Sequence, residues 1–173
     1  ETALAAASDA GLVADAVIAQ SEAQRLQLWG MRDDVEQCNR FQPLFIFDVS
    51  LPIPKMESYV ASVNSALAKS FGAFRNFTFG HIGDGNLHFA ISAGLDESVR
   101  DAVEQAVYQP LAAIQGSVAA EHGVGLERKP YLTISRSFEE LALMRALKDA
   151  LDPKGILNPG KIFDRESVSS ITI

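Results

Sequence analysis

The chain has 173 residues, of which 47% are hydrophobic, and this is enough apolar material to build one globular core. Its net charge of −7 excludes the basic surface of a nucleic-acid-binding domain, and we expect no nucleic-acid partner. The single cysteine excludes an internal disulfide, and the lack of an apolar run of roughly 18 residues predicts no transmembrane segment.

The N-terminal part of the chain predicts two helices and a strand. Residues 1–10 are alanine-rich and are typical of the end of a helix, which Gly11 would terminate. Ser21 begins a capping-box pattern, which predicts a second helix that runs to about Gln37. Residues 44–50 are apolar and rich in residues that favour strands, so we predict a strand there.

The remaining elements follow from hydrophobic periodicity, which is 3.6 residues for a helix and 2 for a strand. Their order is strand–helix–strand, repeated once, which is the split βαβ pattern of ferredoxin-like folds. We therefore predict an α+β fold with an antiparallel sheet, both long helices on one face, and additional helices at the N- and C-terminal ends. The segments are helices at 55–71, 97–115 and 137–151, and strands at 75–81, 87–92 and 116–121.

Two of the three histidines flank a predicted hairpin turn in FGHIGDGNLHFAIS, residues 79–92. If Asp84 and Gly85 are the central residues of a type I′ turn, His81 lies directly opposite His88. Directly opposed side chains share a face of the sheet, with Cβ atoms about 4.5–5.5 Å apart. Both imidazoles could then bind one metal ion. The alternative is a half-exposed histidine pair that binds no metal.

A metal site needs a third ligand, and Glu121 at the end of the strand predicted at 116–121 is the candidate. Gly123 and Gly125 predict a turn there, which could bring both Glu121 and His122 toward the pair. Two histidines and one glutamate are a familiar zinc ligand set that leaves a fourth position open for catalysis. A solvated charge beside a turn is the alternative for Glu121.

Three separated motifs carry a resemblance to a known family. GHIGDGNLH, GSVAAEHGVG and LDPKGILNPGKIF resemble, in order and spacing, the C-terminal domain of the FAD-linked oxidases of the D-2-hydroxyacid dehydrogenase group. This group includes D-lactate dehydrogenase, the glycolate oxidase flavin subunit and D-2-hydroxyglutarate dehydrogenase. The resemblance implies that residues 1–173 are one such domain. A separate N-terminal FAD-binding domain is expected upstream, and the start of the chain at Glu1 instead of methionine agrees with this expectation.

The resemblance implies a role for each matching residue of the central motifs. The metal ligands would be His81, His88 and Glu121. His122 would be the catalytic base, and Asn86 would contact the substrate or a water on the metal.

The resemblance also assigns residues outside these motifs. Arg32 would bind the substrate carboxylate, although an ion pair with Glu36 on the same helix is the alternative. Asn158 and Lys161 would lie near the flavin. Relatives that act on hydroxyglutarate tend to carry a lysine at the position of Ile46 and a threonine at that of Glu36. A second substrate carboxylate is therefore disfavoured, and we expect a lactate- or glycolate-like substrate.

The predicted function is the substrate-binding, or cap, domain of an FAD-dependent dehydrogenase that oxidises a D-2-hydroxy acid to the 2-oxo acid. The reaction would combine metal-assisted proton abstraction by His122 with hydride transfer to FAD. The expected cofactors are FAD, bound mainly by the separate domain, and a divalent metal, with zinc as the first choice. The isolated domain is expected to be inactive.

The expected partners are the 2-hydroxy acid, the protein's own FAD-binding domain and an electron acceptor that the sequence does not identify. A homodimer and a cytoplasmic location are also expected, with peripheral attachment at the inner membrane as an alternative. Two other functions stay open at this point. One is a non-catalytic ferredoxin-like interaction or dimerisation module, and the other is a self-contained zinc hydrolase that uses the two histidines and the glutamate.

Overall fold

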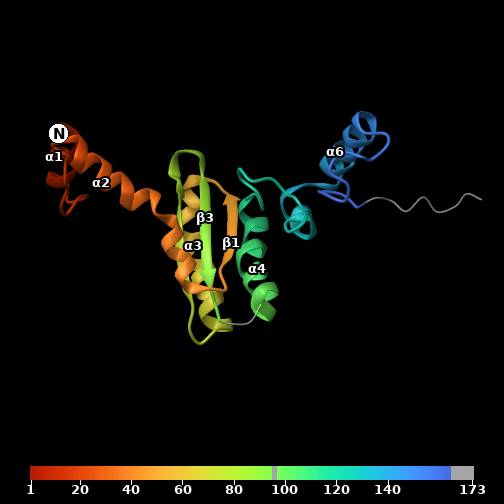
Figure 1. The fold of residues 1–173 in the computed structure, drawn as a ribbon, viewed down its shortest axis with the longest axis horizontal. Helices are drawn as coiled ribbons and strands as arrows, with labels where there is room; N and C mark the ends of the chain where they lie inside the picture. The colour runs from red at the N-terminus through yellow and green to blue at the C-terminus, as the bar shows by residue number, and fades with distance from the viewer. Residues whose placement is uncertain (95–96, 165–173) are drawn as a thin grey trace, which may run out of the picture. The chain divides into compact units, whose positions relative to one another are not determined.

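The computed structural model describes residues 1–94 and 97–164 (Figure 1). The chain divides into two compact units, and the boundary in the sequence lies between Asn39 and Arg40. The predicted α+β class is confirmed, because these residues form α-helices together with a three-stranded antiparallel sheet. Within the same ranges, no helix is long and apolar enough to cross a membrane.

The first unit contains helices α1 (Thr2–Asp9) and α2 (Glu22–Asp33). The hydroxyl of Ser21 accepts a hydrogen bond from the backbone N–H of Gln24 at 3.2 Å and caps α2, as predicted. The side chain of Gln24 accepts from the backbone N–H of Gln20 instead of Ser21, so only half of the expected capping box forms. The predicted end of this helix at Gln37 was wrong, because α2 ends at Asp33 and a separate 3₁₀ segment begins at Val35.

The second unit contains the sheet, in which β3 is the central strand in the order β1-β3-β2. Its elements are β1 (Phe45–Ser50), α3 (Met56–Ser70), β2 (Arg75–His81), β3 (Asn86–Ser92), α4 (Arg100–Tyr108), α5 (Leu132–Ser135) and α6 (Phe138–Leu151). The long helix predicted at 97–115 is shorter than expected. Only α4 is α-helical, and 3₁₀ turns precede and follow it. Pro110 lies in the second of these turns, where its missing N–H cannot continue an α-helix.

The core lies between one face of the sheet and helices α3 and α4 (Figure 1). Strand side chains alternate between the two faces of a sheet, so every second residue of β1 and β3 points toward these helices. The strand residues of the core include Phe45, Phe47, Val49, Leu87, Phe89 and Ile91, and the helix residues include Tyr59, Val63, Leu67, Val103 and Val107. Both helices thus cover the same face, and the intervening residues of β1 and β3 project from the other face.

The fourth strand predicted at 116–121 was wrong. In its place, a single antiparallel bridge joins Ser117 to Ser50 at the end of β1. Beyond this bridge, the backbone N–H of Val118 donates to the hydroxyl of Ser135, and the next N–H groups donate to side-chain oxygens. Backbone donors that side chains satisfy cannot also form a strand ladder. The segment therefore leaves the sheet after one pair of residues.

The predicted hairpin register was also wrong: the partner of His88 is Phe79 instead of His81, which is a shift of two residues along β2. The connection between β2 and β3 spans Ile82 to Gly85, so that His81 pairs with Asn86, and Phe79 pairs with His88. The predicted type I′ turn would need two positive φ angles, but only Gly85 has one, at 76°. A shift of two residues preserves the face of the sheet, so His81 and His88 remain diagonal neighbours on the same face.

Gly85 is the position in this turn where no other residue fits without strain. Its φ of 76° is strained for any other residue, and an added Cβ would overlap the backbone oxygen of Leu51. Gly83 in the same turn has neither constraint, since an added Cβ there meets no atom within 4 Å. We expect Gly85→Ala to lower the free energy of unfolding by about 1–3 kcal/mol, and Gly83→Ala to change it by less than about 0.5 kcal/mol. Urea unfolding of both variants tests this, and equal effects would contradict it.

Candidate functional site

The candidate site lies on the face of the sheet that α3 and α4 do not cover. Asp48 of β1 and His88 of β3 are paired in register, so their side chains share this face. Phe79 of β2 flanks His88 from the other side, and the two ring centroids lie 5.3 Å apart. The loop that leaves the bridge at Ser117 brings Glu121 and His122 to the same place. Three strands and one loop thus build the cluster.

The three predicted metal ligands lie together. His81, His88 and Glu121 each offer a ligand atom, and these atoms all lie within 4.8 Å of one another. The Nε2 atom of His88 is 2.8 Å from Oε1 of Glu121, and the rings of the two histidines meet edge to face with centroids 6.5 Å apart. His81 and Glu121 are exposed, whereas His88 is half-buried, so an ion could reach the group from solvent.

Asn86 supports the glutamate of this group. Its side-chain amide nitrogen donates a hydrogen bond to Oε1 of Glu121 at 2.6 Å, and the residue is buried. The backbone N–H of Asn86 in turn donates to the carboxylate of Asp84 at 3.1 Å, which fixes the start of β3. Among the described residues, Oδ1 of Asn86 is buried and has no hydrogen-bond partner. An acceptor of this kind beside the group is suited to a polar hydrogen of a bound molecule.

His122 joins the cluster from the loop. Its side chain is 59% exposed, and its ring centroid lies 5.6 Å from that of His88. Sequence reasoning left open which way this side chain points, because residues 121 and 122 would face opposite sides of a regular strand. Since the segment is not a strand, Glu121 and His122 both reach the cluster.

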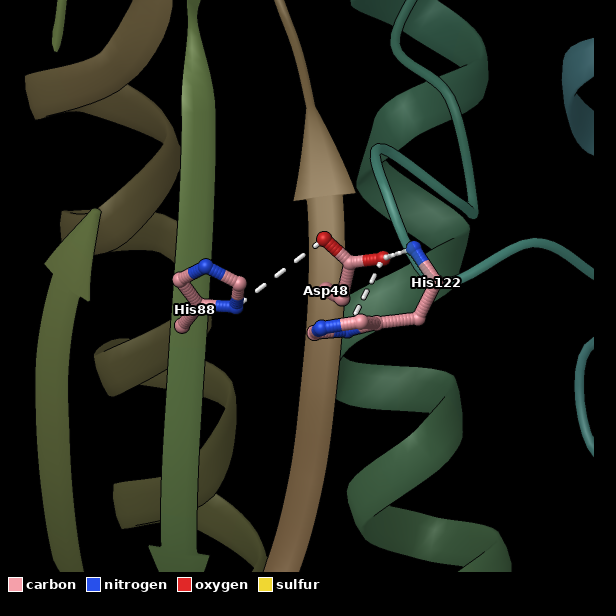
Figure 2. A group of neighbouring side chains, drawn as sticks. All are labelled: Asp48, His88 and His122. Carbon is pink, nitrogen blue, oxygen red and sulfur yellow. Dashed lines mark hydrogen bonds and ion pairs between the residues drawn. The ribbon is translucent and has the colours of Figure 1, made fainter. Parts of the chain in front are cut away.

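Asp48 is a site residue that sequence reasoning missed. Figure 2 shows its carboxylate between the imidazoles of His88 and His122. The Nδ1 atoms of the two rings lie 3.9 Å and 3.5 Å from its oxygens, respectively, and the side chain has 0% exposure. One signal in the sequence could have revealed it, namely a single acidic residue inside the apolar run LFIFDVS. A carboxylate in a buried strand needs compensating partners, and such partners often mark a site.

The loop supplies most of those partners. The backbone N–H groups of Ala120, Glu121 and His122 all donate to the Asp48 carboxylate, at 3.3, 3.1 and 2.9 Å. The guanidinium of Arg128, which is 12% exposed, lies 4.0 Å away and also donates to the backbone oxygen of Gly123 at 2.7 Å. The buried negative charge is therefore both hydrogen-bonded and paired with a cation.

Two groups of possible metal-binding atoms lie in the cluster, and both include His88. The second group, formed by Asp48, His88 and His122, also meets the distance criterion for holding an ion. However, the Asp48 carboxylate already accepts three backbone hydrogen bonds and has no exposed surface. The group of His81, His88 and Glu121 has accessible lone pairs and fits a divalent metal better. Its two nitrogens and one oxygen suit zinc, and they leave a coordination position for another molecule.

Three predicted site residues belong to other parts of the chain than the sheet and the loop at Glu121. Arg32 belongs to the first unit, where its guanidinium contacts Asp33 at 2.7 Å instead of the predicted alternative partner Glu36. Asn158 and Lys161 line a cavity of about 600 Å³ in the C-terminal segment, and the cluster histidines do not contribute to its lining.

Asp152 organises the segment that bears Asn158. Its buried carboxylate accepts hydrogen bonds from the backbone N–H groups of Ile156 and Leu157, both at 2.9 Å. The ammonium group of Lys148 lies 2.6 Å from it, and this contact lowers the pKa of the Asp152 carboxyl below its usual value. The loop after α6 is thus held by a carboxylate, in the same manner as the loop at Glu121.

Comparison with known proteins matches residues 1–162 to the family described as FAD linked oxidases, C-terminal domain. A D-2-hydroxyglutarate dehydrogenase of Xanthomonas citri is 43% identical over 161 residues, which cover 89% of this chain and 34% of that protein. The D-2-hydroxyglutarate dehydrogenase of Stutzerimonas stutzeri is 36% identical, covering 88% of this chain and 34% of that protein. The mitochondrial D-2-hydroxyglutarate dehydrogenase of Bos taurus is 40% identical, and the match covers 90% of this chain and 28% of that protein. The chain therefore spans about a third of the length of these relatives.

Proposed function

Because the chain belongs to the family of FAD-linked oxidase C-terminal domains, we propose that it is the substrate-binding domain of a flavin-dependent dehydrogenase that oxidises a D-2-hydroxy acid to the 2-oxo acid. The observation that carries the proposal is the cluster on the open face of the sheet. There, His81, His88 and Glu121 present three donor atoms within 4.8 Å of one another, and His122 lies beside them. The names of the relatives support a 2-hydroxy acid as substrate.

In this proposal, His81, His88 and Glu121 hold a divalent metal, with zinc as the first choice. When bound, the metal supplies Lewis-acid polarisation of the substrate oxygen atoms. Asn86 keeps the carboxylate of Glu121 turned toward the histidines through its 2.6 Å hydrogen bond. The arrangement of ligands thus depends on a buried amide as well as on the ligands themselves.

His122 is proposed to remove the proton of the substrate hydroxyl. Its imidazole is more than half exposed and lies beside the metal group, so a substrate bound there could reach it. Imidazole is the side chain that most often acts as general base in enzymes. FAD, held mainly by a further domain of the same protein, supplies the acceptor for the hydride that leaves the substrate carbon. The domain itself therefore orients the substrate and takes its proton.

Three more residues enter the proposal through the family. We assign Arg32 to the substrate carboxylate, because a guanidinium can bind a carboxylate with two parallel hydrogen bonds. Its side chain is 61% exposed, and its present partner Asp33 is also on the surface, so this contact costs little to exchange. Asn158 and Lys161 are assigned to the flavin, and both line the cavity of about 600 Å³ in the C-terminal segment.

The side chain of the substrate is a separate question. The names of the three relatives favour a second carboxylate. Ile46 favours an uncharged side chain, since it lies two residues before Asp48 on the open face of β1 and is 53% exposed there. An apolar residue in this place offers no partner to a second carboxylate. We therefore keep a small lactate- or glycolate-like acid as the proposed substrate.

A substrate panel with the full-length protein tests this function. The panel contains both enantiomers of lactate and of 2-hydroxyglutarate, together with the achiral glycolate, and reduction of an artificial electron acceptor is the readout. We expect turnover of glycolate and of the D-enantiomers but not of the L-enantiomers, with D-lactate or glycolate preferred over D-2-hydroxyglutarate. The reverse preference would overturn the role given to Ile46 while it upheld the dehydrogenase. No turnover of any 2-hydroxy acid would overturn the function.

A further inference from the structure

We propose that Asp48 is the positioning residue of the site, which holds the ligand-bearing loop against the sheet and orients the two imidazoles beside it. The inference rests on the proposed function for its catalytic consequence, but the positioning itself concerns only residues of this chain. Asp48 is placed at the centre of the cluster by its pairing with His88 in the sheet (Figure 2).

The first task of Asp48 is to hold the loop. Three consecutive backbone N–H groups, those of residues 120–122, point at one carboxylate. Hydrogen bonds to a charged acceptor are about twice as strong as those between neutral groups. Within residues 1–94 and 97–164, the adjoining segment pairs with β1 only at Ser117, so these three hydrogen bonds take the place of strand pairing in holding Glu121 and His122. One side chain of the sheet therefore substitutes for the missing strand.

The second task is to orient the imidazoles. The carboxylate faces Nδ1 of both His88 and His122, at 3.9 and 3.5 Å. These distances exceed those of good hydrogen bonds, and Nε2 of His88 lies closer to Oε1 of Glu121, at 2.8 Å, than Nδ1 lies to Asp48. A metal that bound Nε2 of His88 would take the place of a proton there, and the buried negative charge of Asp48 would then favour the remaining proton on Nδ1. The same charge beside Nδ1 of His122 favours a proton on that nitrogen, which leaves the Nε2 lone pair of His122 able to accept a proton. Metal-binding histidines usually have a carboxylate or carbonyl partner of this kind on the other ring nitrogen.

Arg128 makes this buried charge tolerable. A carboxylate with no exposed surface is costly unless it is paired and hydrogen-bonded. The Arg128 guanidinium lies 4.0 Å from Asp48 and holds the next turn of the loop through Gly123. The pair thus ties β1 to both sides of the segment that carries Glu121 and His122.

The test is the binding of Zn²⁺ alone to the full-length protein, measured by competition with a chromogenic chelator. We expect Asp48→Asn to weaken Zn²⁺ binding by about 10–100-fold, the range seen when a partner of a metal ligand is removed. The matched control is Asp152→Asn, because Asp152 is also a buried carboxylate that accepts loop N–H groups and pairs with a cation, but it faces no imidazole. We expect this control to bind Zn²⁺ within about threefold of the wild type. Unchanged affinity in a folded Asp48→Asn protein would overturn the proposal.

Two further readouts keep the inference testable if the variant does not fold or the proposed function fails. In the wild-type protein, hydrogen exchange at the amides of residues 120–122 should be slowed, although the side chain of His122 is exposed. Exchange as fast as in an unstructured peptide would overturn the proposal without any variant. If the dehydrogenase activity is confirmed, Asp48→Asn should lower kcat by a larger factor than it raises KM. Asp48→Glu, which keeps a carboxylate, should restore part of the lost kcat. The Zn²⁺ affinity and the amide hydrogen exchange still test the positioning role of Asp48 if the protein oxidises no hydroxy acid.

Discussion

Replacement of both His81 and His88 by alanine is expected to abolish metal binding. The two residues supply two of the three donor atoms of the candidate metal group, and Glu121 alone is an ordinary surface carboxylate. We expect about one equivalent of divalent metal per wild-type chain and none in the variant, by elemental analysis after dialysis. Since Lewis-acid polarisation is worth several kcal/mol, kcat of the full-length protein should fall by at least ~10²–10³-fold.

The controls for this experiment come from the same cluster. His81 is exposed, so the single variant His81→Ala should lose metal without loss of folded protein, whereas His88 is half-buried and its removal also removes packing against Phe79. His122→Asn removes the third histidine but leaves the ligand group intact, and should keep its metal. Metal retained by the double variant would exclude this ligand set. A wild-type protein that binds no metal would exclude the metal itself.

Replacement of His122 by asparagine is expected to lower kcat by about 10²–10⁴-fold, the usual contribution of a general base. The metal content should stay at the wild-type level, because Glu121 and the two histidine ligands remain. The free energy of unfolding should change by less than about 0.5 kcal/mol, since the side chain is 59% exposed. Stopped-flow measurement of flavin reduction by the substrate separates this step from later electron transfer.

Comparison of His122→Asn with His81→Ala distinguishes loss of the general base from loss of the metal. Both remove one exposed histidine from the same cluster, but only His81→Ala should release metal. If flavin reduction in His122→Asn proceeds at the wild-type rate, His122 is not the base. If both variants lose metal and activity together, the two donor groups that share His88 act as one, and the separate roles given to His81 and His122 would be wrong.

Local sequence patterns account for most elements of the fold. The apolar, strand-favouring run at 44–50, the hairpin pattern around 84–85 and the helical spacing at 55–71 predicted β1, β3 and α3 to within about two residues, and the helix predicted at 137–151 matches α6 as closely. Such patterns succeed because burial of one face of a strand or helix is already encoded in the spacing of its apolar residues. They failed at 116–121, where the apolar residues are compatible with a strand but the N–H groups of Val118, Ala120 and Glu121 donate to the side chains of Ser135 and Asp48, which are distant in the chain.

The sequence by itself predicted which residues are suited to the chemistry. The histidines, Glu121 and Asn86 were proposed from residue type, spacing and resemblance, and the structure brings them together. The shared face of His81 and His88 was also predicted, and it survived a wrong register because side chains alternate with a period of two. The sequence also predicted the α+β class from the order of its strands and helices, and the family from several separated motifs, and both predictions are confirmed.

Only the tertiary structure decided how these residues meet. The length of the hairpin connection set the true partners of His81 and His88, because a 3₁₀ turn and the positive φ of Gly85 replaced the expected two-residue turn. The structure also brought Asp48 under the loop of residues 120–122 and paired it with Arg128. Long-range contacts of this kind depend on where strands and loops lie in space, and no local pattern encodes them. The sequence marks Asp48 only as an acidic residue in an apolar run, and the fold decides which groups its carboxylate contacts.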